Sequence, residues 1–280
     1  MKPSFVITGD GQRPDILAAM KETEAWLSKI ADIAAVDYSR DLPLADIKAD
    51  YVVVFGGDGS IIGAARRLTG RPIPVVGINF GTFGYLAAFE RSETRECLEC
   101  IVRGELAPSR RMLLECQVKR SGSPIGRWLC VNEAAVTAPT HTRMIELLLT
   151  IAGCPATRYR GDGVLIATPL GTTAYNLSAG GPVLNPRLEA MTITPLCPHL
   201  LTLRSLVVPA EEKVSVNVFG PDEASLLVDG RIVHRVMPEE ELNVTRAPEY
   251  FLLMESPKRS YYQTLHLKLN WGERPRYAQS

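Results

Sequence analysis

The sequence has no excess of either charge, few cysteines and no long apolar run. Lysine and arginine together number 31, as do aspartate and glutamate, so no basic field is available to gather nucleic acid. No apolar segment follows Met1-Lys2, and no apolar run approaches about 18 residues, so we expect a cytoplasmic protein without a membrane partner. These absences leave an ordinary globular chain of 280 residues, enough for one large domain or two smaller ones.

The cysteines and histidines show no pattern of metal ligands. Six cysteines are too sparse for a disulfide scaffold, and Cys97-x-x-Cys100 has no second pair to complete a zinc site. We therefore expect reduced, mostly buried thiols. The four histidines have no ligand spacing, and we assign none of them a catalytic role.

The most informative motif is YVVVFGGDGS at residues 51–60, where an apolar strand runs into glycines and then a helix. Glycines at such a turn let backbone N–H groups approach a phosphate closely, and the helix start favours negative charge. Asp58 is anomalous because a carboxylate repels phosphate. It therefore indicates a general base, a metal ligand or a partner for a sugar hydroxyl. The alternative is a tight turn in which Asp58 caps the helix.

The turn matches neither common nucleotide-binding template. No Gly-Lys pair occurs in the chain, which excludes a P-loop. The pattern Gly57-x-Gly59 is followed by Gly63 one position too late for a Rossmann fingerprint.

The first ninety residues alternate between strand and helix patterns. Apolar runs predict strands at 4–8, 34–38, 51–55 and 73–78, with helices at 14–30, 61–68 and 92–104 and a helical turn at 44–48. Because these runs are continuous rather than alternating, they indicate a parallel sheet covered on both faces. We expect an open, Rossmann-like α/β domain over residues 1–105, with its ligand beyond the carboxyl ends of the strands.

From residue 106 the chain changes character. Short β-rich runs separated by turn residues occur at 112–119, 128–137, 144–151, 163–168, 206–208, 214–219, 226–228 and 232–236. They predict a second, mainly antiparallel β domain over 106–250. The tail, 251–280, carries further β-like runs as far as residue 269. The sequence leaves open whether this tail packs against the first domain.

Two polar segments interrupt this β domain. Residues 161–186 are dense in small and polar residues, and a short helix there suits a nucleoside, with Tyr175 beside a base and Thr173 and Ser178 as hydrogen-bond partners. A close-packed structural turn is the alternative. Asn132-Glu133 interrupts an apolar strand, so at least one of the two side chains enters the interior.

Asn132 would suit a ribose diol, although a satisfied buried polar residue explains the same pattern. Asp229-Gly230 lies between two strand-like runs and predicts first of all a hairpin turn.

Together these segments resemble the NAD kinase family. The motifs that carry the resemblance are GGDGS at 56–60, NFGTFGYL at 79–86, VNE at 131–133, the long segment from Asp162-Gly163 to Pro186, ITPLCPH at 193–199, LVVP at 206–209 and Asp229-Gly230. The resemblance covers about residues 51–235. It implies a fold of the NAD-kinase/diacylglycerol-kinase type, with an α/β domain followed by an all-β domain.

The resemblance also implies an activity and a site. The γ-phosphoryl group of ATP would pass to the 2′-hydroxyl of the adenosine ribose of NAD, with Asp58 as catalytic base. The residues implied to bind NAD are Asp58, Gly59, Asn132, Glu133, Asp162, Thr173, Ala174, Tyr175, Ser178 and Asp229. From the residues themselves, we expect the turn of Gly56, Gly57, Gly59 and Ser60 to hold the ATP phosphates, and we associate the charged Arg160, two residues before Asp162, with ATP rather than polyphosphate as donor. A divalent ion, Mg²⁺, would be held through substrate phosphates, and a homodimer or homotetramer is implied.

The chain departs from the family pattern at several places. Leu170 and Thr172 replace the usual Thr and Ser, and Arg204-Ser205 replaces Arg-Pro. Polyphosphate as donor stays open, as do two other functions: a diacylglycerol-type lipid kinase and a dinucleotide-binding sensor without catalysis.

Overall fold

The computed structural model describes residues 2–81, 84–139, 144–220 and 223–269, and it divides into two compact units. The first unit is formed by the chain up to Leu68, Ile73–Ser109 and the chain from Leu252 on. The second is formed by Thr69–Pro72 and Arg110–Phe251. Each unit has its own hydrophobic core.

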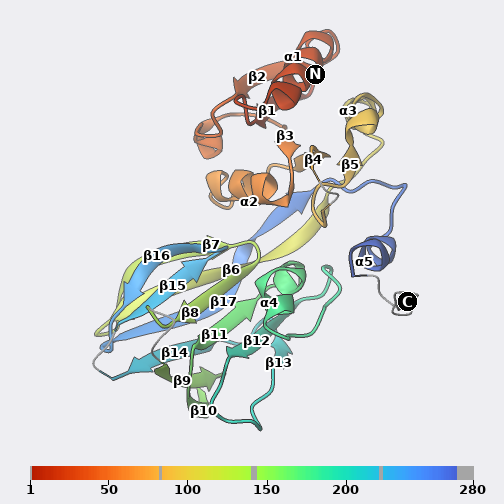
Figure 1. Cartoon of the computed structure of the whole chain (residues 1–280). Helices are drawn as coiled ribbons and strands as arrows, with labels where there is room; N and C mark the ends of the chain where they lie inside the picture. Colours follow the sequence, from red (N-terminus) through yellow and green to blue (C-terminus); the bar gives the residue numbers. More distant parts are fainter. Residues whose placement is uncertain (1, 82–83, 140–143, 221–222, 270–280) are drawn as a thin grey trace, which may run out of the picture. The chain divides into compact units, whose positions relative to one another are not determined.

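The first unit is built on a parallel sheet. Its strands lie in the order β2, β1, β3, β4, with β5 also beside β4 (Figure 1). Their bounds are β1 (Ser4–Gly9), β2 (Asp32–Asp37), β3 (Tyr51–Gly56), β4 (Val75–Asn79) and β5 (Phe89–Glu90). In β3 the residues from Val52 to Gly56 are all buried, as the unbroken apolar run predicted.

Helices cover both faces of this sheet. They are α1 (Pro14–Leu27), α2 (Asp58–Arg67) and α3 (Thr94–Val102), with short turns η1 (Leu44–Asp46) and η2 (Arg91–Glu93). Met20 of α1 and Leu98 of α3 share one core with Phe55. Gly77 of β4 faces α2, since a Cβ there would overlap the side chain of Ile61.

Two of the predicted helix limits differ from the structure. The first helix ends at Leu27 rather than at Ile30, whose side chain is exposed, because the chain turns there to enter β2. The helix predicted from residue 61 begins three residues earlier, so Asp58 lies in its first turn.

The described residues from Leu252 to Leu269 belong to the first unit. Strand β17 (Glu240–Leu253) ends with Leu253 paired in parallel to Val75 of β4. The predicted β-like runs are therefore confirmed as far as Leu253, but they are wrong for α5 (Tyr261–Leu269). A capping box starts this helix: the Ser260 hydroxyl accepts the Gln263 N–H at 3.2 Å, and the Gln263 side chain accepts the Ser260 N–H at 2.8 Å.

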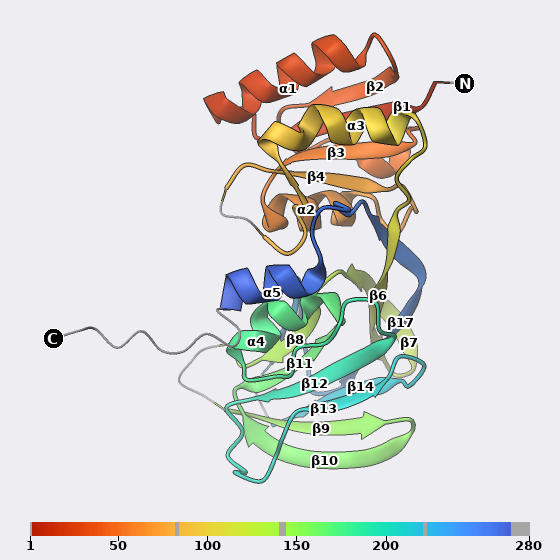
Figure 2. The same cartoon turned by 90° about the vertical axis from the view of Figure 1, so that its right-hand side faces the viewer.

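The second unit consists of two antiparallel sheets (Figures 1 and 2). One sheet has the order β13, β12, β11, β8, β15, β16; in the other, β10, β9, β14 and β17 follow one another, and the β6–β7 pair joins β17. The bounds are β6 (Ser109–Arg120), β7 (Ser123–Cys130), β8 (Glu133–Thr137), β9 (Ile145–Ile151), β10 (Cys154–Gly161), β11 (Gly163–Ala167), β12 (Ala190–Leu196), β13 (Leu206–Pro209), β14 (Val214–Phe219), β15 (Ala224–Val228) and β16 (Arg231–Val236). Val136 and Ile166 of the first sheet share a core with Leu147 and Val216 of the second. This is the predicted antiparallel β domain.

Two short helical segments interrupt the strands of the second unit. They are η3 (Leu170–Thr173) and α4 (Tyr175–Ser178), which follow β11 directly. The predicted helix in this segment is thus divided in two at Ala174.

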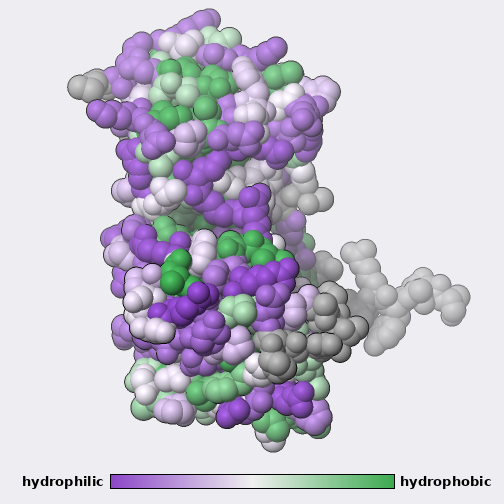
Figure 3. Space-filling model, turned by 90° about the vertical axis from the view of Figure 1, so that its left-hand side faces the viewer, coloured by the Kyte–Doolittle hydropathy of each residue, from purple (hydrophilic) through white to green (hydrophobic). Residues whose placement is uncertain are grey.

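No described helix is long and apolar enough to cross a membrane. On the face drawn in Figure 3, hydrophilic residues separate small groups of hydrophobic ones. The large apolar side chains are concentrated instead in the two cores.

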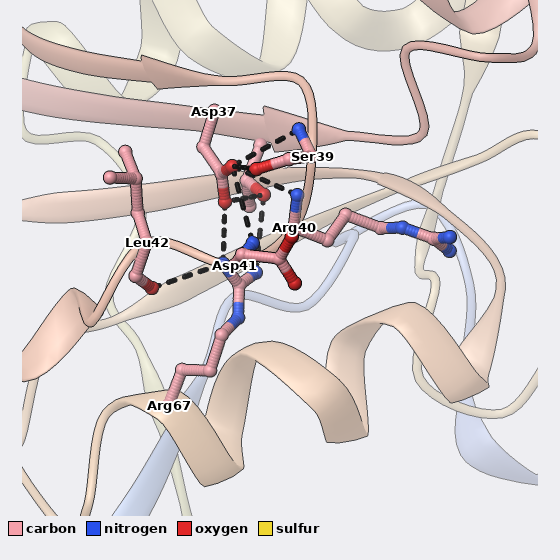
Figure 4. A network of polar contacts seen from close by, with 7 residues as sticks. Asp37, Ser39, Arg40, Asp41, Leu42 and Arg67 are labelled. Carbon is pink, nitrogen blue, oxygen red and sulfur yellow. Dashed lines mark hydrogen bonds and ion pairs between the residues drawn. The ribbon is translucent and has the colours of Figure 1, made fainter.

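A buried aspartate organises the segment after β2 (Figure 4). Asp37 Oδ1 accepts the N–H groups of residues 39–41 at 2.8 to 3.4 Å. Its Oδ2 accepts the Thr8 hydroxyl at 2.9 Å and the guanidinium of Arg67, at the end of α2, at 2.5 Å. Burial opposes the charged form of Asp37, but the hydrogen bonds from Arg67, Thr8 and Ser39 prevail and lower its pKa.

The substitution Asp37→Asn should destabilise the first unit by about 3 kcal/mol, because it leaves Arg67 without its nearly buried anion. Since the folded-state pKa of Asp37 is lowered, its contribution is complete above the ordinary value of 3.8 and is lost as the pH falls through the lower value. Urea unfolding at pH 7 and at decreasing pH measures both effects.

Asp15→Asn is the matched control, because Asp15 forms a largely exposed ion pair with Arg13 and its loss should change little. Equal stability of the Asp37→Asn and wild-type proteins at pH 7 would contradict the role of the network.

Candidate functional site

The glycine-rich turn joins β3 to α2 as the sequence predicted. Gly57 is extended and precedes the helix, and Asp58 is the first helical residue. A Cβ at Gly57 or Gly59 would meet no atom within 4 Å, and neither residue has a positive φ. The fold of this unit does not itself require glycine at these two positions. Their backbone is open to the close approach of a ligand at a helix start.

Asp58 is held by a loop of its own unit. Its Oδ2 accepts the N–H of Tyr85 at 2.7 Å, and its Oδ1 accepts those of Leu86 and Ala87 at 3.0 and 3.1 Å. A Cβ at Gly84 would overlap this carboxylate. Asp58 therefore does not cap its own helix, since its carboxylate is fixed by backbone donors 27 to 29 residues further along the chain.

Tyr85 also brings a hydroxyl group toward Asp58, which the sequence reasoning missed. Burial, with a smaller contribution from the charge of Asp58, raises the pKa of Tyr85. Its buried hydroxyl has no hydrogen-bond partner within the described part of the chain. Tyr261 of α5 interacts electrostatically with Tyr85. Burial, and after it the interaction with Tyr85, raise the pKa of Tyr261 to about 12. Thr82 and Phe83 of the same loop lie outside the described residues.

A cavity of about 830 Å³ in the first unit borders the strand that leads into the glycine turn, because Phe55 of β3 is one of its lining residues. Trp26 of α1, Asn79 of β4 and Arg95 of α3 contribute to its wall, while Asp58 and the glycines of the turn are not among its described lining residues. The cavity thus reaches Phe55, directly before the turn, while the turn itself is not part of its described lining.

In the second unit, the chain bends between β7 and β8 at Asn132. The N–H groups of residues 131–133 all donate to the carboxylate of Asp229, at 3.1, 2.7 and 3.2 Å in chain order. Thr168, after β11, donates its N–H to the Asn132 carbonyl at 2.8 Å. A Cβ at Gly171 of η3 would overlap the Asn132 backbone. The structure therefore brings the Asn132-Glu133 pair, the β15–β16 turn and η3 together.

Glu133 enters the interior, as predicted for one member of the pair. The residue is only 5 % exposed, and its Oε2 has no hydrogen-bond partner among the residues described. Burial and the charge of Asp229 raise the pKa of Glu133 to about 7, although the N–H of Tyr175 donates to its carboxylate and opposes the shift. Near neutral pH this carboxyl group is able both to donate and to accept a hydrogen bond.

Asn176 shows why part of the polar segment is structural. It is fully buried, and its Nδ2 donates to the carbonyls of Thr172 and Pro182 at 3.3 and 3.0 Å. Its Oδ1 accepts the hydroxyls of Thr192 and Thr194 at 3.2 and 2.7 Å. In contrast, Tyr175 is 45 % exposed. Thr173 and Ala174 are half-buried and Ser178 is exposed, so the four predicted contact residues remain accessible while Asn176 packs the segment.

Arg160 and Asp162 lie at the other end of the β8–β11 pair from Glu133. Glu133 is opposite Ala167, whereas Thr137 is opposite Gly163, next to Asp162. Four residues of strand separate the two ends, roughly 13 Å. Both Arg160 and Asp162 are exposed, and the hydrogen bond to Asp162 raises the pKa of the Cys197 thiol.

The described residues contain no group of three or more His, Cys, Asp or Glu side chains able to hold a metal ion. All six cysteines are free, and Cys116 and Cys130 lie with their Sγ atoms 3.3 Å apart.

An α/β unit with a carboxylate at an open glycine turn, together with a β unit that clusters groups suited to a nucleoside, defines the class of two-unit nucleotide kinases. Family profiles match both units: ATP-NAD kinase N-terminal domain over residues 18–106 and ATP-NAD kinase C-terminal domain over 131–256. The chain belongs to the NAD kinase family. The resemblance and the kinase activity predicted from the sequence are thereby confirmed.

Individual relatives agree with this assignment. The NAD kinase of Rhodopirellula baltica is 36% identical over 273 residues, 97% of this chain and 88% of the relative. The NAD kinase of Geobacter sulfurreducens is 37% identical over 235 residues, 84% and 82% of the two chains. Neither the lipid kinase nor the non-catalytic sensor finds support in these matches.

Solved structures show the same fold. Yeast NADH kinase complexed with NADH matches with a TM-score of 0.90 and 22% identity, over 99% of this chain and 90% of the other. An NAD kinase from Archaeoglobus fulgidus in complex with ATP matches with a TM-score of 0.77 and 24% identity, over 95% and 98%.

The substitution Gly84→Ala should displace the Asp58 carboxylate, because the added Cβ would overlap it. We expect a fall of about 100-fold in kcat for NADP formation, since a shift of about 1 Å in a reacting group has an effect of this size. Steady-state kinetics of the purified variant measure it.

Gly63→Ala in α2 is the control, because a Cβ there meets no atom within 4 Å and alanine favours a helix. It should keep its activity. A folded Gly84→Ala protein with the wild-type kcat would show that the fixed orientation of Asp58 is not required.

Proposed function

We propose that Asp58 is the general base in the transfer of the γ-phosphoryl group of ATP to the 2′-hydroxyl of the adenosine ribose of NAD. The observation that carries this role is the carboxylate fixed by three backbone N–H groups beside the open backbone of Gly57 and Gly59. Asp58 would orient the hydroxyl and accept its proton. A strong base is unnecessary, because proton loss can lag behind P–O cleavage in a loose transition state.

Gly56, Gly57, Gly59 and Ser60 would hold the phosphates of ATP through the backbone at the start of α2. Arg160 is a further candidate for contact with ATP. Mg²⁺ would neutralise phosphate charge when it binds with the nucleotide. ATP is the proposed donor, with polyphosphate as the alternative.

The proposed NAD contacts are those that the family motifs of this chain imply. Asn132 and Glu133 would meet the adenosine part and its ribose, and the exposed Tyr175 ring would lie beside the adenine. The remaining residues proposed to contact NAD are Asp58, Gly59, Asp162, Thr173, Ala174 and Ser178. Asp229 belongs to this part of the site through its hydrogen bonds to the backbone of residues 131–133. Support comes from the unpartnered Glu133 Oε2 and from the accessibility of the residues around Tyr175.

The relatives support the two substrates. The yeast protein of the same fold was crystallised with NADH and the Archaeoglobus protein with ATP. We propose a cytoplasmic homodimer or homotetramer with functional domains at 1–105 and 106–250 and a tail at 251–280.

The proposed function is tested by incubating the purified chain with NAD, ATP and Mg²⁺ and coupling NADP formation to an NADP-specific dehydrogenase. We expect NADP with ATP, and a parallel reaction with polyphosphate determines the donor range. If neither donor yields NADP, the proposed reaction is refuted.

Asp58→Asn should lower kcat by a factor on the order of 100 to 10,000, because the amide cannot accept the proton. NAD binding, measured by calorimetry, should persist. The exposed Asp46→Asn variant removes the same charge from the first unit and should keep its activity. Normal turnover of the Asp58→Asn enzyme would remove Asp58 from the mechanism.

A further inference from the structure

At the bend of residues 131–133, three successive backbone N–H groups need a hydrogen-bond acceptor. The bend lies between two strands, where the chain leaves the regular ladder, and the three N–H groups point to one place. Each buried donor left without a partner would cost about 1–3 kcal/mol. A single carboxylate, that of Asp229, accepts all three.

The hairpin turn sets this carboxylate in place. Asp229 and Gly230 have φ values of 46° and 76°, as a two-residue turn between β15 and β16 requires. The Asp229 N–H in turn donates to the Glu133 carbonyl at 3.0 Å. Asp229 therefore joins the turn to the bend through four hydrogen bonds: its carboxylate accepts three, and its own N–H donates one.

We propose that Asp229 is a positioning residue, which acts on NAD through Asn132 and Glu133 instead of contacting it. This inference rests on the proposed role of the Asn132-Glu133 pair. The carboxylate oxygens of Asp229 point into the backbone of the bend, while the Glu133 carboxyl group remains buried with Oε2 unpartnered. Asp229 thus shapes the bend, and Glu133 presents the free hydrogen-bonding capacity to the substrate.

The charge of Asp229 gives this role a second, measurable effect. Glu133 faces Asp229 in the turn, the Cys130 thiol at the end of β7 and the Tyr175 N–H of α4. Cys130 carries no charge near neutral pH, because its hydrogen bond with Cys116 and its burial raise its pKa well above the ordinary value. The negative charge acting on Glu133 is therefore that of Asp229, which, after burial, raises the pKa of Glu133. Without it, the pKa of Glu133 falls.

The experiment compares wild-type protein with Asp229→Asn in the full chain. The amide keeps the size of the side chain but removes its charge and one of its acceptor oxygens. We expect the KM for NAD to rise about tenfold, the value for one lost hydrogen bond or more, with a smaller effect on kcat. In the pH profile of kcat/KM, the limb that reports the ionisation of Glu133 should move to lower pH.

Three further variants separate the effects. Glu133→Gln should abolish that limb, and adding Asp229→Asn to it should then shift nothing further in the profile. Asp229→Glu retains the charge but moves the acceptor oxygens, so the KM should rise while the limb stays in place. Glu223→Gln removes a half-buried charge immediately before β15, where it pairs with Arg235, and should change neither quantity.

Two results would overturn the positioning role of Asp229. An unchanged KM for Asp229→Asn overturns the proposal, and so does a raised KM with an unmoved limb, which would mean a structural role alone. If Asp229→Asn does not fold, the KM and pH limb of Asp229→Glu decide instead. Calorimetric titration with NAD at several pH values reads the same shift without turnover. An inactive wild-type enzyme would contradict the proposed function, whereas the comparison among variants tests Asp229.

Discussion

The structure depends on aspartates that each accept three consecutive backbone N–H groups. Asp37 holds residues 39–41, Asp58 holds 85–87 and Asp229 holds 131–133. Each segment lies outside the regular hydrogen bonding of a helix or sheet or at its edge, where backbone N–H groups need another partner. A charged acceptor makes such hydrogen bonds stronger than neutral ones. The irregular segments nearest the proposed chemistry are consequently fixed rather than free.

The sequence could predict the strands, because their apolar runs are continuous, and the kinase family, because its motifs are long and specific. It could not predict the donors to Asp58. These are backbone N–H groups of residues 85–87, and a backbone donor leaves no trace in the identity of its residue. The pairing became visible only when the fold placed the loop against α2. Helix α5 was not predicted for a different reason: its capping signal, Ser260-x-x-Gln263, is present, but the tail was interpreted as β-like runs as far as residue 269.

Within the polar segment, residue type did not separate packing from binding. Asn176 and Ser178 are two positions apart and equally polar, yet Asn176 is fully buried with four hydrogen bonds and Ser178 is exposed. Which of them faces a ligand depends on where α4 lies relative to β12, and that contact joins residues sixteen to eighteen positions apart. The prediction of a nucleoside pocket and the alternative of a structural turn each describe part of the segment.

The return of the chain end to the first unit has a consequence for synthesis on the ribosome. Leu253 extends the pairing of β4, while Lys258 and Arg259 bind Glu96 and Glu90 beside α3. These partners emerge after every residue of the second unit has been translated. Because domains fold as they become available, the β unit is complete first, and the α/β unit waits with one sheet edge unfinished. The glycine-rich turn at residues 56–60 is thus among the earliest segments made, and its unit is the last to close.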